Sequence, residues 1–161
     1  MALSSRTGTL QSSIRAAVAA GLSVWLAQLL ALEYPIYAMI SAVIVTDLSP
    51  TETRRSGWRR LAGTRLGAVV GAALSGILAS GSLSIGAAIL VAMVLCHLLP
   101  LRGAAVLCGY VCGIVMLEHS GQPWGYALMR LVETALGIGV ALGVSFVPKL
   151  LPVDSHAARD H

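Results

Sequence analysis

The chain has 161 residues, of which 57% are hydrophobic and only 11% are charged, and its mean hydropathy is +0.82. A soluble domain needs about 25% charged residues to cover its surface, so this composition excludes an ordinary soluble protein and predicts one whose solvent is largely lipid. The net charge of +4 would favour a nucleic-acid partner in a soluble protein, whereas in a membrane protein the position of each Lys and Arg matters more than their sum.

The first apolar run covers residues 16–32 and follows a polar start that carries Arg6 and Arg15. Such a start resembles a secretory signal peptide. The run is nevertheless longer than the usual apolar core of a signal peptide, and more apolar runs follow it. We therefore interpret it as the first transmembrane helix, retained in the protein.

Apolar segments continue along the chain at the length of membrane crossings, which take about 20 residues each. The predicted spans are residues 14–32, 36–48, 61–80, 84–99, 104–117 and 126–147. They form one membrane domain, 14–148, between cytoplasmic tails at 1–13 and 149–161. Because the spans use most of the chain, we expect no soluble catalytic domain.

A helix start precedes the third span. Ser49 can cap the helix, Pro50 suits its first turn, and Glu52 stands where a capping box needs it. We expect a short helix along the membrane surface, with side chains that bind anionic lipid headgroups. These are Arg54, Arg55, Arg59, Arg60 and Trp58.

The basic residues also predict the topology. With the N-terminus in the cytoplasm, the outer loops contain no Lys or Arg, and the basic residues gather on the cytoplasmic side, as the positive-inside rule requires. The residues placed there are Arg6, Arg54, Arg55, Arg59, Arg60, Arg102, Lys149 and Arg159. We therefore expect both termini to be cytoplasmic.

An eight-residue pattern, R-L-x-x-T-x-x-G, occurs at residues 60–67 and again at 130–137. Each copy begins a long apolar segment, and a proline precedes the middle span of each half, at Pro35 and Pro100. An odd number of spans separates the copies, so the second enters the membrane from the opposite side. This pattern is typical of inverted repeats, which hold a transport site near the midplane. We predict an all-α membrane protein of six helices in two inverted three-helix repeats.

On these residues the chain resembles the FUSC-like, aromatic acid exporter superfamily over residues 10–150. The resemblance rests on Pro35 and on the heads of the third and sixth spans, namely Arg60, Gly63, Thr64, Gly67, Arg130, Glu133, Thr134 and Gly137. It implies efflux of small organic anions, such as aromatic carboxylates, across a bacterial inner membrane or an internal membrane. It also implies a homodimer that supplies a second six-helix unit. Two alternatives stay open: an anion channel on the same scaffold, and a small structural subunit of a larger membrane complex.

Polar side chains inside the spans are the candidates for substrate binding. Arg65 is placed inside the third span, where a charge either faces the bundle interior or extends to the interface. Arg130 and Glu133 share a helix face and can pair, either as a structural latch or as part of an anion site. We assign anion binding to Arg65, Arg130, Glu133, Thr64 and Thr134.

Small residues spaced by about one helical turn predict close helix packing. They are Gly63, Gly67, Gly71, Gly137, Gly139 and Gly143. Cys96, Cys108 and Cys112 lie within apolar runs, and their odd number and spacing suit neither a disulfide framework nor a zinc site. We expect no metal, no cofactor, no nucleic-acid partner and no enzymatic activity. The expected partners are membrane lipids and further copies of the chain.

Overall fold

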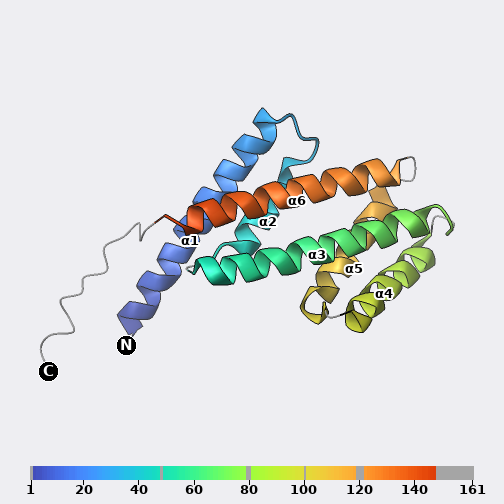
Figure 1. The fold of residues 1–161 in the computed structure, drawn as a ribbon, viewed down its shortest axis with the longest axis horizontal. Helices are drawn as coiled ribbons and strands as arrows, with labels where there is room; N and C mark the ends of the chain where they lie inside the picture. Colours follow the sequence, from blue (N-terminus) through green and yellow to red (C-terminus); the bar gives the residue numbers. More distant parts are fainter. Residues whose placement is uncertain (1, 48, 79–80, 100, 119–121, 148–161) are drawn as a thin grey trace, which may run out of the picture.

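The computed structural model describes residues 2–47, 49–78, 81–99, 101–118 and 122–147 (Figure 1). These residues form helices and short connections, with no strand among them. The helices are α1 (Ala2–Leu29), α2 (Pro35–Val45), α3 (Pro50–Ser75), α4 (Ser82–Leu98), the 3₁₀ turn η1 (Arg102–Ala104), α5 (Ala105–Glu118) and α6 (Pro123–Ser145). The prediction of an all-α protein is confirmed. The predicted tail at 149–161 lies outside the described residues.

Two helical segments in the described part of the chain are long and apolar enough to cross a bilayer: Leu10–Leu29 and Pro123–Ser145. The helices α2, α4 and α5 are apolar but shorter. The helix α3 has 26 residues, which corresponds to about 39 Å at 1.5 Å per residue, and its first half carries the basic cluster. The number of membrane crossings therefore stays a prediction.

Three helices begin at proline, because a proline at the first helical position lacks only an N–H that would have no partner there. Pro35, Pro50 and Pro123 begin α2, α3 and α6. The predicted start at Pro50 is thus confirmed, but the capping box is not formed. The Ser49 hydroxyl instead lies 2.6 Å from the Thr51 hydroxyl.

The predicted surface helix and third span are one continuous helix, α3, which is a correction to the sequence-based prediction. Tertiary contacts hold the helix straight across the expected break. A side chain at Gly57 would meet Ile138 of α6, and one at Gly63 would meet Leu107 of α5. The predicted N-terminal tail, 1–13, is likewise helical from Ala2 onward, where α1 begins.

The helices α3 and α6 run side by side in opposite directions through the centre of the molecule (Figure 1). Each packs on the middle helix of the other half of the chain: α6 lies against α2, and α3 lies against α5. The helix α1 packs outside α2 and α6, and α4 packs outside α3 and α5. The central pair α3 and α6 is therefore enclosed by helices from both halves.

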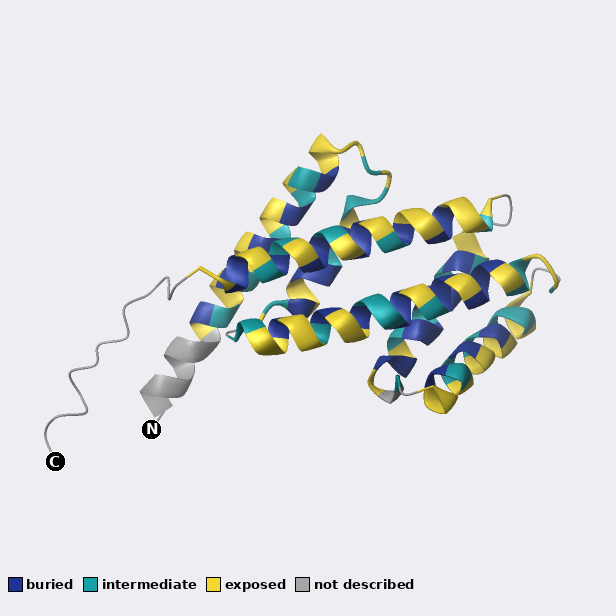
Figure 2. Cartoon of the chain, viewed as in Figure 1, coloured by how far each residue is buried: buried dark blue, intermediate teal, exposed yellow. Residues whose placement is uncertain are grey.

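Small residues fill the interior, and large apolar residues lie outside. Ala38, Ala68, Ala92 and Ala141 are buried, whereas exposed large apolar side chains occur on every α-helix. Figure 2 shows buried and exposed positions alternating along the helices. A soluble monomer exposes only limited apolar patches. An outer surface of this kind therefore suits contact with lipid.

The end of α1 contains the one non-glycine residue with positive φ among those described, Ala31 at 50°. Its N–H donates to the Gln28 carbonyl (3.0 Å), and the Leu32 N–H donates to the Ala27 carbonyl (2.9 Å). These two bonds form a Schellman motif, in which glycine usually occupies the left-handed position. The alanine here carries the steric cost of that conformation.

Candidate anion-binding site

The central helices α3 and α6 present the same spacing of residues to the interior. Arg60, Gly63, Thr64 and Gly67 are buried in α3, and Arg130, Glu133, Thr134 and Gly137 are buried in α6. Offsets of three, four and seven residues lie on one helix face. The repeated pattern of the sequence therefore corresponds to the two buried faces of the central helix pair.

Arg130 is the one Lys or Arg residue of α6, and 3% of its surface is exposed. Its guanidinium carbon lies 3.0 Å from the centroid of the Tyr37 ring of α2. Within the described part of the chain, its Nε and Nη1 atoms have no hydrogen-bond partner. A buried cation without hydrogen bonds is costly, so these two donors are positioned to take an anionic acceptor.

Glu133 lies one turn away from Arg130 and is fully buried. Its Oε1 accepts a hydrogen bond from the backbone N–H of Tyr34 (2.8 Å), and its Oε2 has no partner among the described residues. The predicted pairing of Arg130 with Glu133 is therefore not formed in this structure. The start of α2 attracts both side chains instead, the carboxylate through a backbone N–H and the guanidinium through an aromatic ring.

Three tyrosines lie around this cluster, although the position of Tyr34 and Tyr37 on either side of Pro35 would by itself predict an interfacial aromatic belt. The ring of Tyr126 packs edge-on against Tyr34, with centroids 5.5 Å apart. The Tyr37 and Tyr126 hydroxyls are 3.0 Å apart, and the Tyr126 hydroxyl donates to Oε2 of exposed Glu118 (3.2 Å). A hydrogen-bonded chain thus runs from the end of α5 to the ring beneath Arg130.

Tyr34 itself lies in the connection between α1 and α2. Desolvation and the adjacent carboxylate of Glu33 raise the pKa of Tyr34 above its ordinary value. Its hydroxyl therefore stays protonated at neutral pH and donates to Oε1 of Glu33 (3.3 Å).

Arg60 is the counterpart of Arg130 in α3, and its placement corrects the prediction that it binds lipid headgroups. It is 4% exposed, and its Nε donates to the Ser41 hydroxyl of α2 (2.9 Å). Among the described residues, its Nη1 and the buried Oγ1 of Thr64 have no hydrogen-bond partner. The positional signal was available in the sequence, because Arg60 occupies the same place in the repeated pattern as Arg130.

Arg65 does not belong to either buried face. It is exposed on the outer side of α3, so the interpretation that it faces the bundle interior is wrong. Its offset of five residues from Arg60 turns it by about 140° at 100° per residue, away from the buried face. The other members of the predicted headgroup cluster are exposed, as expected: Arg54, Arg55, Arg59 and Trp58.

The glycines at the helix crossings explain how closely the helices approach. An added Cβ at Gly67 would overlap the carbonyl oxygen of Cys108 in α5, and one at Gly137 would overlap that of Ala38 in α2. Gly63 and Gly71 also pack against α5. Gly139 and Gly143, predicted as packing residues, face outward with nothing within 4 Å of an added Cβ.

The three cysteines are free and buried. The thiols of Cys108 and Cys112 donate to the carbonyls of Ala92 (3.4 Å) and Ala88 (3.6 Å), so they serve as small core residues between α4 and α5. No group of three His, Cys, Asp or Glu residues in the described ranges could hold a metal ion.

A family model described as aromatic acid exporter family member 1 matches residues 10–147. The matched range includes both buried faces and all of the tyrosines around Arg130. Neither a curated protein nor a solved structure matches the chain.

Proposed function

The chain belongs to the aromatic acid exporter family, a family of integral membrane transport proteins, and on that premise we propose that it exports small organic anions that carry an aromatic ring and a carboxylate. The observation that carries this proposal is the buried guanidinium of Arg130, whose Nε and Nη1 donors have no partner among the described residues. Each of these N–H groups can donate a charge-assisted hydrogen bond to a carboxylate oxygen.

The surroundings of Arg130 suit the aromatic part of such a substrate. The ring of Tyr37 lies against the guanidinium, and the ring of Tyr34 packs against those of Tyr37 and Tyr126. Aromatic pairs contribute about 0.5–1.5 kcal/mol beyond the area they bury. A carboxylate bound at Arg130 would place its ring among these tyrosines. Thr134, one turn further along α6 and buried, adds a hydroxyl to the same face.

We propose that Glu133 regulates how tightly the anion is held. The Tyr34 N–H holds its Oε1 at 2.8 Å, which leaves the Arg130 donors available to substrate. The nearby negative charge opposes a bound anion, and this opposition favours release. Protonation of Glu133 would remove it, so the same residue could couple proton movement to transport.

The packing supports two inverted repeats. Gly67 of α3 abuts Cys108 of α5, and Gly137 of α6 abuts Ala38 of α2. Each residue of the first contact is displaced by 70 positions in the second. An exchange of the two halves therefore converts one contact into the other, as a pseudo-two-fold axis in the membrane plane would.

Such an axis gives Arg60 a role equivalent to that of Arg130. Both are buried, and they lie on antiparallel helices that enter the membrane from opposite sides in the proposed topology. We propose that Arg60 and Thr64 form an anion-binding site on the cytoplasmic side of the transport path, and that Arg130 forms the corresponding site on the outer side. The orientation follows the charges: Arg54, Arg55 and Arg59 are exposed at the start of α3, whereas Glu33 and Glu118 are exposed at the opposite turns.

We also propose that the protein acts as a homo-oligomer that packs through α6. Gly139 and Gly143 are four residues apart on its exposed face, and this spacing allows close approach of a second helix. A Gly139→Leu substitution should lower the dimer fraction in mild detergent, with Gly86→Leu, on the exposed side of α4, as the matched control. Equal dimer fractions in the two variants would contradict this contact.

The central test is flux into liposomes that contain the purified protein. We expect uptake of benzoate to exceed that of acetate, which lacks the ring, and that of benzyl alcohol, which lacks the charge. Arg130→Gln should reduce benzoate flux about tenfold to a hundredfold, since a hydrogen bond to a charged group contributes about 1.5–3 kcal/mol. Arg54→Gln, at the exposed start of α3, is the matched control.

Equal rates in Arg130→Gln and the parent protein would remove Arg130 from the mechanism. Flux that does not saturate with benzoate concentration would favour an anion channel on the same scaffold. Stoichiometric co-purification with a large membrane complex, together with no flux, would favour a structural subunit.

A further inference from the structure

A groove on the outer side of α3 contains a charge that the proposed transport path does not use. Its volume is about 460 Å³. The α3 residues Trp58, Arg65, Leu66 and Val69 line it, together with Leu101 from the connection between α4 and α5. Leu61 and Ala62 lie between them, so the α3 positions recur every three to four residues and form one stripe along the helix, with the cation in the middle of an apolar surface.

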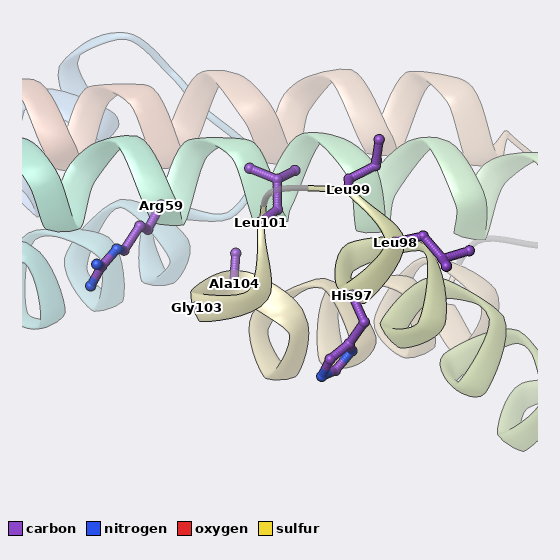
Figure 3. A pocket seen from close by; sticks show the side chains of 7 residues that line it. All are labelled: Arg59, His97, Leu98, Leu99, Leu101, Gly103 and Ala104. Atoms are coloured by element: carbon purple, nitrogen blue, oxygen red, sulfur yellow. The ribbon is translucent and has the colours of Figure 1, made fainter.

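A second depression adjoins the groove, since Leu101 lines both, and Figure 3 shows the residues that line this second depression. Its volume is about 540 Å³, and its polar residues are Arg59 of α3 and His97 near the end of α4. Arg59 packs over Gly103, where an added Cβ would lie 3.5 Å from its Nε. The two depressions together place a polar pocket next to an apolar groove.

The charge of the two depressions, and the position of Arg65 on the outer side of α3, indicate which ligand occupies them. Both depressions carry an arginine, and no acidic residue is among the described residues that line either one. Arg65 is about 9 Å further along α3 than Arg59, at 1.5 Å per residue. Side chains on a helix lean toward its N-terminus, which for Arg65 is the direction of Trp58 and Arg59. A cation on the lipid-facing side of a membrane helix needs an anion, and the phospholipid phosphate is the anion that the bilayer supplies at this depth.

We propose that this groove and pocket bind one anionic phospholipid. Its phosphate contacts Arg59 and Arg65, its headgroup occupies the pocket beside His97, and one acyl chain lies along Leu66 and Val69. The tryptophan at the top of the groove marks the interface, where indole rings are enriched. This site is independent of anion transport, since its residues lie on the opposite side of α3 from Arg60 and Thr64.

Trp58 provides the test, because it lines the groove and the chain has only two other tryptophans, Trp25 and Trp124. Both of these are 58% exposed, so Trp25→Phe and Trp124→Phe leave Trp58 as the sole reporter without disturbing the core. The full chain is reconstituted in phosphatidylcholine vesicles that contain a small mole fraction of lipid brominated on its acyl chains. The brominated lipid is either phosphatidylglycerol or phosphatidylcholine, and quenching of Trp58 is measured.

We expect brominated phosphatidylglycerol to quench Trp58 at about one-thirtieth of the mole fraction that brominated phosphatidylcholine requires, the preference expected from two cations at about 1 kcal/mol each. Arg65→Gln leaves Arg59 in place and should lower this preference to about fivefold, whereas Arg55→Gln, exposed but outside the groove, should retain it in full. Circular dichroism and gel filtration confirm that the variants are folded.

Equal quenching by the two lipids would overturn the proposal, as would an undiminished preference in Arg65→Gln. Weak quenching by both lipids would show that another protein surface covers the groove, and this too would overturn it. Benzoate flux plays no part in the measurement, so its outcome is separate from that of the transport proposal.

Discussion

Arg130 lies over the ring of Tyr37, with its guanidinium carbon 3.0 Å from the ring centroid. The two residues come from opposite halves of the chain, α6 and α2. An aromatic ring stabilises a cation without occupying its N–H donors, whereas a carboxylate partner would occupy them. The contact therefore keeps Arg130 buried and still available to an anion, which a simple ion pair with Glu133 would not.

Two substitutions of Tyr37 should distinguish the role of its ring from that of its hydroxyl. We expect Tyr37→Leu to lose about 1–2 kcal/mol of stability, because the buried guanidinium loses its cation–π contact, and to lose most benzoate flux. Tyr37→Phe keeps the ring and loses only the hydroxyl contact with Tyr126 (3.0 Å), so its flux should stay within about twofold of the parent, a loss typical of one weak hydrogen bond. Thermal unfolding in detergent and liposome flux are the measurements. Equal losses in both variants would show that the hydroxyl, rather than the ring, matters.

Arg60→Met should separate a transport role from a structural one. A buried charge that is replaced by an apolar side chain of similar volume often leaves stability unchanged or raises it. Because Arg60 has an Nη1 without a partner in the described part of the chain, we expect the unfolding temperature to stay the same or to rise, while anion flux falls about tenfold or more. A clear loss of stability with normal flux would instead identify Arg60 as a structural residue.

The glycines at the two helix crossings should not tolerate a methyl group. In Gly67→Ala and Gly137→Ala the new Cβ would overlap a backbone carbonyl, which cannot rotate away. Overpacking of this kind costs about 1–3 kcal/mol, more than the gain in helix propensity. The control is Gly86→Ala in α4, where nothing lies within 4 Å and helix propensity predicts a gain of up to about 1 kcal/mol. Thermal unfolding distinguishes the three variants, and a stabilised Gly67→Ala would show that α3 and α5 are less closely packed.

Ala31→Gly should stabilise the protein. Ala31 has a φ of 50° at the end of α1, a conformation that costs an alanine about 1–2 kcal/mol relative to glycine. The greater entropy of glycine in the unfolded chain offsets part of this gain, so we expect a net increase of about 0.5–1 kcal/mol in the free energy of unfolding. Ala73→Gly, exposed near the end of α3, is the control and should be destabilising by about 1 kcal/mol. A lower unfolding temperature in Ala31→Gly would contradict the left-handed conformation.

The arginines show how far the sequence pattern could predict the site. The repeated pattern gives Arg60 and Arg130 matching positions, and both are buried, although Arg60 was assigned to the lipid headgroups. For Arg65, its depth in the apolar run left two directions open, toward the bundle interior or toward the interface. Depth along a helix and direction around it are different quantities, and only the helical offset of five residues shows that Arg65 points away.

The tyrosines and the helix α3 show what the sequence pattern could not predict. Tyr34 and Tyr37 flank Pro35 near a predicted membrane boundary, and that position alone favours an interfacial belt. Their contacts with Arg130, Glu133 and Tyr126 depend on how α2 packs against α6, which no local pattern reports. The break expected between the basic cluster and the third span is absent for a similar reason, since contacts of Gly57 and Gly63 with other helices stabilise one continuous α3.

The sequence by itself determined that this is an all-α membrane protein in which one residue pattern begins two apolar segments, because composition sets the solvent and residue spacing sets which side chains share a helix face. Only the tertiary structure decided the partners of those faces. Gly67 and Gly137 each meet a backbone carbonyl from the other half of the chain, and Arg130 meets an aromatic ring rather than Glu133. These contacts join residues far apart in sequence, and they are set by the close fit of whole helices, which local spacing does not specify.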